Sequence, residues 1–266
     1  MPRSILTVPV RKFGATGSLE EQDLVAVEEP LQIRVGEQNL ALTMRTPGND
    51  AELAAGFLLT EGFVRQPSDI IDIKCSRNTA VVRLTEGVHI DLDGAERNFY
   101  MTSSCGVCGK ASIDALNTAG GIVLPRNTPK VDESLIRSLP AKLRESQAVF
   151  NRTGGLHACG LFSAEGSLIV LREDVGRHNA VDKLIGRALL DGRLPLHDHV
   201  LMVSGRTSFE LVQKAVMAGI PILVAVGAPS SLAVKTALRF GMTLIGFLRD
   251  DRFNVYSGAG RIYRSK

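Results

Sequence analysis

Tryptophan is absent from the sequence, tyrosine occurs three times, and the 266 residues include only four cysteines. So few cysteines exclude a disulfide framework of the kind that holds small secreted proteins together. The shortage of aromatic residues removes the stacking platforms on which single-stranded nucleic acids bind. The 31 basic residues are scattered along the chain rather than gathered into a stripe. We therefore expect no nucleic acid among the partners.

Long apolar runs are also missing, since no stretch approaches the roughly 20 residues that cross a bilayer. The first ten residues, MPRSILTVPV, lack the apolar core and small-residue cleavage site of a signal peptide. We expect a protein of the reducing cytoplasm, with no membrane partner. The hydrophobic content of 44% is that of a globular protein, and the net charge of +3 weakly favours an anionic ligand.

The first half of the chain has the patterns of a small α+β unit. Residues 1–22 are partly polar and contain Gly14 and Gly17, so we expect a mobile N-terminal tail. Residues 23–116 form the predicted N-terminal α+β domain, which ends in a CxxC loop and its helix. Period-two alternation predicts antiparallel strands there, and one helix is expected near residues 51–59. The predicted strands are Leu24–Val27, Leu31–Val35, Leu40–Met44, Ile70–Lys74, Ala80–Leu84 and Val88–Leu92.

The second half has a different pattern. Residues 117–130 contain two glycines and two prolines and are predicted to be a linker. In residues 131–266, apolar runs such as Ile222–Val226 alternate with amphipathic helices, which predicts parallel strands buried on both faces. The expected order is helix, strand, strand, helix, strand, helix, strand, helix, strand. This order is similar to the cytidine-deaminase fold, so we expect a cytidine-deaminase-like layered α/β domain without its zinc site.

The cysteine pair Cys105 and Cys108 lies in the stretch Ser104-Cys-Gly-Val-Cys-Gly109, just before an expected helix. Glycine leaves a thiol uncovered, and the amino end of a helix favours the thiolate. A cysteine pKa of about 8.5 in free solution falls in such a setting. The pair is therefore a candidate for sulfur chemistry, and half a zinc site, a dithiol redox pair, a sulfur carrier and two inert cysteines all fit it.

Each of the other interpretations of the pair has a weakness. A structural zinc ion needs four ligands, and only His157 and Cys159 offer a second pair. We expect these two to be ordinary core residues of a strand. A redox CxxC belongs after the first strand of a βαβ unit, which is not its place here. We assign no role to Cys75.

Two predicted strands of the second half end in turns of small residues that begin helices. These turns are Val203–Ser208 and Val226–Ser231, and the helix amino ends that follow them suit an anion such as phosphate. The candidate residues are Gly205, Arg206, Thr207, Ser208, Ser230 and Ser231. Helix capping alone would explain the hydroxyl residues, whereas Arg206 goes beyond what capping requires.

The segment Arg172–Asn179 is a third candidate loop, although a solvated loop explains it equally well. A deaminase needs a zinc-binding His or Cys, two further cysteines and a catalytic Glu at the helix starts. His178 is in the right neighbourhood, but the Glu and both cysteines are missing there. Deamination is therefore not expected.

Six longer motifs stand out along the chain, at Ser104–Gly109, Arg152–His157, Glu173–Lys183, Val203–Glu210, Ala228–Thr236 and Gly246–Asn254. Together they resemble the FdhD family of sulfur-carrier accessory proteins for formate dehydrogenase. The resemblance covers nearly the whole chain beyond the N-terminal segment.

The resemblance implies a sulfurtransferase. A cysteine desulfurase would load a persulfide onto Cys105. Cys108 is the second cysteine of the motif, and the resemblance leaves open whether sulfur transfer requires it. The sulfur would pass to a molybdenum bis(molybdopterin guanine dinucleotide) cofactor, the bound acceptor, which then enters formate dehydrogenase. The family's nucleotide contact falls on Phe247, Leu248, Arg249, Asp250, Asp251 and Arg252.

Within that contact, Leu248 and Asp250 are expected to offer backbone only, and the two arginines would meet phosphate. The implied protein holds no permanent metal, and we expect a symmetric homodimer. A cofactor-binding chaperone that carries no sulfur is the rival interpretation, and a degenerate zinc deaminase is a third.

Overall fold

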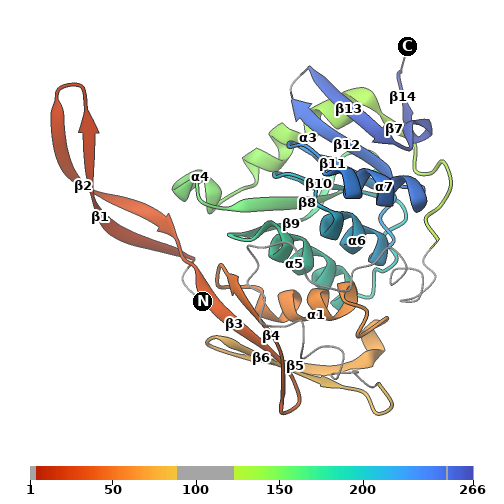
Figure 1. Cartoon of the computed structure of the whole chain (residues 1–266), viewed down its shortest axis with the longest axis horizontal. Helices are drawn as coiled ribbons and strands as arrows, with labels where there is room; N and C mark the ends of the chain where they lie inside the picture. The colour runs from red at the N-terminus through yellow and green to blue at the C-terminus, as the bar shows by residue number, and fades with distance from the viewer. Residues whose placement is uncertain (1–3, 89–122, 250, 266) are drawn as a thin grey trace.

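The computed structural model describes residues 4–88, 123–249 and 251–265. Figure 1 shows a mixed α/β fold with several sheets, from which a long N-terminal hairpin extends. Among the described residues no helix is both long and apolar enough to cross a bilayer. The cysteines Cys105 and Cys108, the last predicted strand and helix of the N-terminal half, and Asp250 lie outside the described residues.

The segment expected as a tail forms a two-stranded antiparallel ribbon instead. Strand β1 spans Ile5–Gly14 and strand β2 spans Gly17–Ala26, paired residue for residue along their whole length. Arg11 and Lys12 on β1 are paired with Glu20 and Glu21 on β2, the closest contact being 2.7 Å between Lys12 Nζ and Glu21 Oε2. Charged residues lie on both faces of the ribbon, so these strands show no apolar alternation in the sequence. The segment is a pair of strands rather than the tail without secondary structure that its composition suggests.

The N-terminal half forms a four-stranded sheet in the order β4-β3-β6-β5, and helix α1 packs on one of its faces. Strands β3 and β6 run parallel, whereas the pairs β3–β4 and β5–β6 are antiparallel hairpins. The predicted strands and helix within residues 24–84 are all present. Their bounds are β3 Glu29–Val35, β4 Gln38–Arg45, α1 Asp50–Thr60, η1 Pro67–Asp69, β5 Ile70–Ser76 and β6 Thr79–Leu84.

The C-terminal half is built on a six-stranded sheet in the order β13-β12-β11-β10-β8-β9. Strands β10, β11 and β12 are parallel and largely buried, as their apolar runs predict, while β8, β9 and β13 are antiparallel to their neighbours. Its elements are β7 Val131–Asp132, α3 Glu133–Glu145, α4 Phe150–Thr153, β8 His157–Ser163, β9 Leu168–Asp174, α5 Arg177–Leu190, β10 His199–Val203, α6 Phe209–Met217, β11 Ile222–Ala225, α7 Ser231–Arg239, β12 Thr243–Arg249, β13 Arg252–Ser257, η2 Ala259–Arg261 and β14 Ile262–Tyr263.

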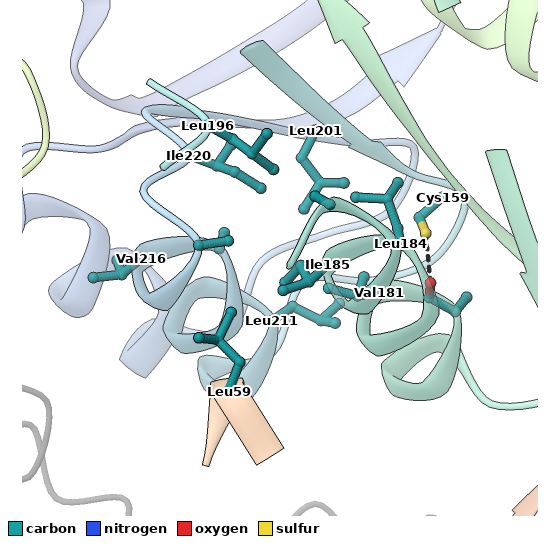
Figure 2. Close-up of a cluster of buried hydrophobic side chains, with 14 of the residues drawn as sticks. Leu59, Cys159, Val181, Leu184, Ile185, Leu196, Leu201, Leu211, Val216 and Ile220 are labelled. Atoms are coloured by element: carbon teal, nitrogen blue, oxygen red, sulfur yellow. Dashed lines mark hydrogen bonds between the residues drawn. The ribbon is translucent and has the colours of Figure 1, made fainter. Parts of the chain in front are cut away.

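Two apolar clusters hold the layers together. Helix α3 covers one face of the six-stranded sheet through Ile136, Leu139 and Leu143. The other cluster lies beneath α5 and α6 and continues into the N-terminal half, joining residues such as Leu59 to Val181 (Figure 2). The two predicted domains therefore share one core, and their exact boundaries stay a prediction.

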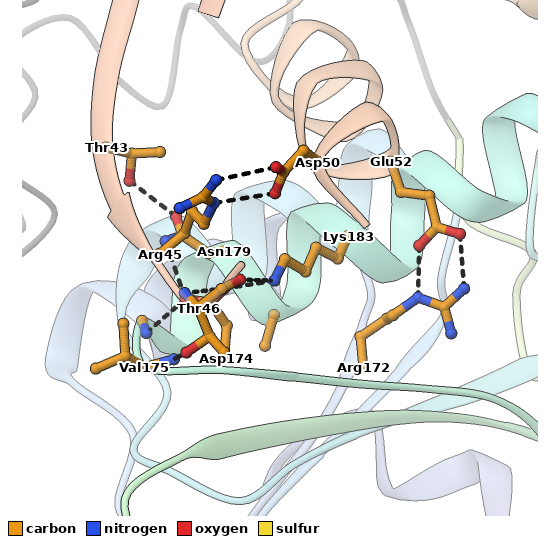
Figure 3. Close-up of polar contacts among 12 residues, drawn as sticks. Thr43, Arg45, Thr46, Asp50, Glu52, Arg172, Asp174, Val175, Asn179 and Lys183 are labelled. Carbon is orange, nitrogen blue, oxygen red and sulfur yellow. Dashed lines mark hydrogen bonds and ion pairs between the residues drawn. The ribbon is translucent and has the colours of Figure 1, made fainter. Parts of the chain in front are cut away.

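Helices α1 and α5 cross at two glycines. A Cβ atom on Gly56 would lie 1.8 Å from the backbone oxygen of Asp182, and one on Gly186 would lie 1.8 Å from that of Glu52. Only glycine permits such a close approach of two helix backbones. Beside the crossing, the carboxylate of Glu52 accepts two hydrogen bonds of 2.5 and 2.7 Å from the guanidinium of Arg172 (Figure 3).

Much of the motif Glu173–Lys183 also serves this junction. The fully buried carboxylate of Asp174 pairs with Lys183 Nζ at 2.7 Å and accepts a hydrogen bond from the backbone N–H of Thr46. Asn179 donates to the same carboxylate and to the carbonyl of Met44 (Figure 3). The ion pair and the hydrogen bonds to the buried carboxylate offset the free-energy cost of its desolvation. Because the partners come from both halves of the chain, these contacts fix how the two halves meet.

Candidate functional site

The loops that follow the three parallel strands lie against one another. The N–H of Gly227, after β11, donates to the carbonyl of Gly205, after β10, at 3.1 Å. The N–H of Phe247, near the end of β12, donates to the carbonyl of Gly227 at the same distance. Thr207 and Ala228 are joined in the same way. The predicted residues Gly205, Arg206, Ser208 and Phe247 therefore belong to one continuous edge of the sheet.

Close backbone contact explains the glycines of this edge. A Cβ on Gly227 would come within 2.9 Å of the backbone of Arg206, so a larger residue would push the two loops apart. Phe247 has a positive φ of 53°, a rare conformation for a residue with a side chain, and the residue is 41% exposed. Backbone held in this way often marks a binding site.

The turn from β12 to β13 carries the predicted nucleotide contact. Arg249 and Arg252 are opposite each other across the two strands, and both are exposed. Within the described residues neither guanidinium takes part in an ion pair. Leu248 is buried in the core under α3, which leaves only its backbone for a ligand, and Asp251 is exposed in the turn. Two like charges on opposite residues repel, and an anion bound between them would relieve that repulsion.

The two predicted helix-start serines differ. Ser230 caps α7, because its Oγ accepts a hydrogen bond of 3.2 Å from the N–H of Ala233. Ser208 precedes α6 but makes no capping bond within the described part of the chain. Its Oγ lies 3.1 Å from Nε2 of His178, and the same nitrogen lies 2.9 Å from Oε2 of Glu210. Capping therefore explains Ser230 and does not explain Ser208.

The start of α5 brings further polar groups to the same edge. A Cβ on Gly205 would lie 3.3 Å from Nδ1 of His157 and 3.6 Å from Cδ of Arg177. Burial lowers the pKa of His157, and the charges of Arg177 and His178 lower it further, so the imidazole is neutral near pH 7. These residues come from β8, α5 and the loop after β10, and the sequence alone did not indicate that they meet.

A pocket of about 510 Å³ opens between α3 and this edge. Its wall combines apolar side chains, among them Leu143 and Met202, with His157 and Ser204. Arg144 lies over the ring of Phe150, which also lines the pocket, at 4.2 Å from its centroid. His157 is thus a pocket residue rather than the core residue expected from its strand.

The remaining cysteines behave as expected. Cys159 is fully buried, its Sγ donates to the carbonyl of Ala180 at 2.9 Å, and burial raises its pKa far above the ordinary value (Figure 2). A thiol in that state is a core group and does not ligate a metal. Cys75 is exposed at the end of β5. Among the described residues, no group of three or more His, Cys, Asp or Glu side chains is placed to hold a metal ion.

Comparison with known proteins gives one consistent result. The model of the FdhD/NarQ family matches residues 26–263. The sulfur carrier protein FdhD of Streptomyces coelicolor is 53% identical over 251 residues, which cover 90% of this chain and 89% of that protein. The protein of the same name from Sulfolobus acidocaldarius is 49% identical over 242 residues, covering 91% and 92%.

Among solved structures, a formate dehydrogenase accessory protein from Desulfotalea psychrophila matches with a TM-score of 0.79 and 27% sequence identity. The match covers 98% of this chain and all of the other. The family resemblance drawn from the motifs is thereby confirmed over nearly the full length. The chain belongs to the FdhD/NarQ family.

Proposed function

We propose that this chain is a sulfur carrier required for formate dehydrogenase activity, and that Cys105 carries the sulfur. Relatives of about 50% identity are named sulfur carrier proteins. The chain has the cysteine that such a role needs, in the glycine-flanked stretch Ser104–Gly109. Cys159 is excluded as the carrier because it is buried and its pKa is raised.

The proposed donor is a cysteine desulfurase. The Cys105 thiolate attacks the outer sulfur of the donor's persulfide, a new S–S bond forms on Cys105, and the donor cysteine leaves as a thiolate. In delivery, the outer sulfur leaves Cys105, which keeps the bonding pair as a thiolate. The transferred sulfur is then at the zero-valent level, and the molybdenum centre of the acceptor, as the two-electron reductant, would reduce it to a sulfido ligand. Cys108 is a second cysteine whose need is open to test.

The proposed acceptor is the molybdenum bis(molybdopterin guanine dinucleotide) cofactor, held as a substrate at the ends of the parallel strands. The observation that supports this site best is the exposed arginine pair Arg249 and Arg252, which forms no ion pair among the described residues. The start of α6, which Ser208 does not cap within the described part of the chain, belongs to the same edge of the sheet. Guanidinium groups and helix amino ends are the usual partners of phosphate. Phe247 offers an exposed ring at the same edge for the flat part of such a ligand.

The C-terminal half is, in our proposal, related to the cytidine deaminases. Its strand order β9-β8-β10-β11-β12 and the helices between the parallel strands support that relationship. The positions that would hold zinc contain His178 and the segment Ser204–Ser208, which has no cysteine. The edge of the sheet would have kept its place as a binding site while the chemistry changed.

Loading of the carrier can be tested by mass spectrometry. The purified protein is incubated with a cysteine desulfurase and cysteine, and its peptides are analysed without reductant. We expect one additional sulfur atom on the peptide that contains Cys105, and none after Cys105→Ala. Sulfur loading of Cys105→Ala to the level of the unchanged protein would refute the assignment.

The rival function is a chaperone that holds and inserts the cofactor without carrying sulfur. The two functions differ in what Cys105→Ser does. A carrier loses formate dehydrogenase activation while it still binds a guanine nucleotide, whereas a chaperone keeps both. A symmetric homodimer and a cytoplasmic location remain predictions.

A further inference from the structure

The neighbours of His178 determine which atom donates in its hydrogen bond with Ser208. Nε2 of His178 lies 2.9 Å from the carboxylate of Glu210, which only accepts hydrogen bonds. That nitrogen must therefore carry a hydrogen, because two facing lone pairs would repel. The hydrogen bond from His178 also lowers the pKa of Glu210.

The hydroxyl of Ser208, 3.1 Å from the same nitrogen, consequently acts as an acceptor toward His178. Its own hydrogen points elsewhere and remains available for another acceptor. Ser230 provides the contrast, since it uses its Oγ to cap α7. Among the described residues Ser208 makes no capping bond, so its Oγ satisfies none of the first N–H groups of α6.

Two buried polar atoms near Ser208 also lack a hydrogen-bond partner among the described residues. The side chain of Thr207 is 1% exposed, and its Oγ1 has no hydrogen-bond partner among the described residues. Nε of Arg177, which lies beside Gly205, is buried and equally unpartnered within that part of the chain. Buried polar atoms are rarely left unpaired, and such groups at one edge are typical of a site that is completed by a ligand.

We infer that His178 and Glu210 are positioning residues, which hold Ser208 so that its hydroxyl hydrogen and the open first turn of α6 receive a phosphate group of the acceptor. Glu210 orients the imidazole, and the imidazole orients the serine. Neither residue needs to touch the ligand. The inference rests on the proposed acceptor site and adds the groups that organise it.

A double-mutant cycle with GDP as the probe tests this arrangement. The dissociation constant is measured by calorimetry for the unchanged protein, Ser208→Ala, His178→Ala and the double variant. Loss of a hydrogen bond to a charged group is expected to weaken binding roughly tenfold in each single variant. Because His178 acts through Ser208, the double variant should bind no more weakly than Ser208→Ala alone.

A second cycle combines Glu210→Ala with Ser208→Ala. Glu210 lies nearer the surface than His178, so its replacement should leave folding intact. Ser230→Ala is the matched control, since it removes a helix cap and should leave the GDP affinity unchanged. Thermal unfolding reports stability separately, and a purely structural role would lower the melting temperature without the non-additive pattern in affinity.

Additive losses of GDP affinity in both cycles would overturn the positioning role of His178 and Glu210, but not the proposal of the acceptor site. Absence of any GDP binding to the unchanged protein would overturn the acceptor site and the positioning role together. Non-additive losses in both cycles, with Ser230→Ala unaffected, are the result that the geometry predicts.

Discussion

The helix crossing at Gly56 gives a sharp prediction about what joins the two halves of the molecule. Replacing Gly56 by alanine would place a methyl group 1.8 Å from the backbone oxygen of Asp182. Carbon and oxygen atoms that are not bonded do not approach so closely, and backbone atoms cannot rotate away as a side chain would. Helix α1 must therefore move away from α5 by more than about 1 Å, which forfeits much of the attraction across the interface.

The change in the free energy of unfolding caused by Gly56→Ala is the sum of two opposing effects. Inserting a methyl group into a packed interface costs about 1–3 kcal/mol, and a clash with backbone belongs at the upper end of that range. Alanine favours a helix over glycine by about 1 kcal/mol, which partly offsets the clash. We expect Gly56→Ala to lower the free energy of unfolding by about 2 kcal/mol or more.

Urea unfolding measures the effect directly. Gly14→Ala is the control, because a Cβ at Gly14 meets nothing within 4 Å among the described residues, and its stability should change by less than about 0.5 kcal/mol. The sign of the result is decisive. If the helices did not cross at Gly56, alanine would stabilise the protein, and a gain of about 1 kcal/mol would refute the reasoning.

The other predictions concern a buried charge, the acceptor site and the free thiols. Among the described contacts, Lys214 supplies the only ammonium within 3 Å of the buried carboxylate of Asp182. Lys214→Met should therefore lower the free energy of unfolding, measured with urea, by about 3–5 kcal/mol. Lys235→Met is the control, because Lys235 is exposed and its replacement should leave the free energy of unfolding unchanged. Equal stability of the two variants would contradict the contacts. Arg249→Ala should weaken GDP binding about tenfold or more and reduce its salt dependence, measured by calorimetry at two ionic strengths; an unchanged affinity would count against the anion site. With both cysteines of the CxxC motif replaced, a native thiol titration should detect Cys75 alone and a second thiol only after unfolding. Although Cys75 is exposed, partial desolvation by its neighbours and the nearby carboxylate of Asp50 raise its pKa, so it should react slowly at neutral pH. Two fast thiols would contradict the structure.

Sequence patterns predicted the parts of the fold that depend on local periodicity. The continuous apolar run of β11 indicated a strand buried on both faces, and the structure has that strand at the centre of the sheet. The N-terminal ribbon was missed because Lys12 and Glu21 pair across strands, a relationship that no single window of sequence contains. Strand β13 is absent from the predicted strands, and only its first residue, Arg252, belongs to the predicted nucleotide contact.

The site was predictable in outline and not in detail. Gly205 follows β10 and Phe247 lies near the end of β12, so their meeting at one edge follows from the rule for parallel sheets. Ser208 and Ser230 have equivalent places before helices, and only the tertiary position of His178 gives them different roles. The close approach of His157 to Gly205 likewise arises from the packing of β8 beside β10, which the local sequence does not specify.

In the proposed mechanism, Cys105 carries sulfur to a cofactor bound elsewhere on the same protein. The most direct measurement is the activity of formate dehydrogenase produced in cells that lack their own carrier and express either this chain or Cys105→Ser. GDP affinity of the purified variant is measured in parallel. We predict that Cys105→Ser binds GDP as the unchanged protein does and yields inactive formate dehydrogenase. Active enzyme from cells that express Cys105→Ser would contradict the account.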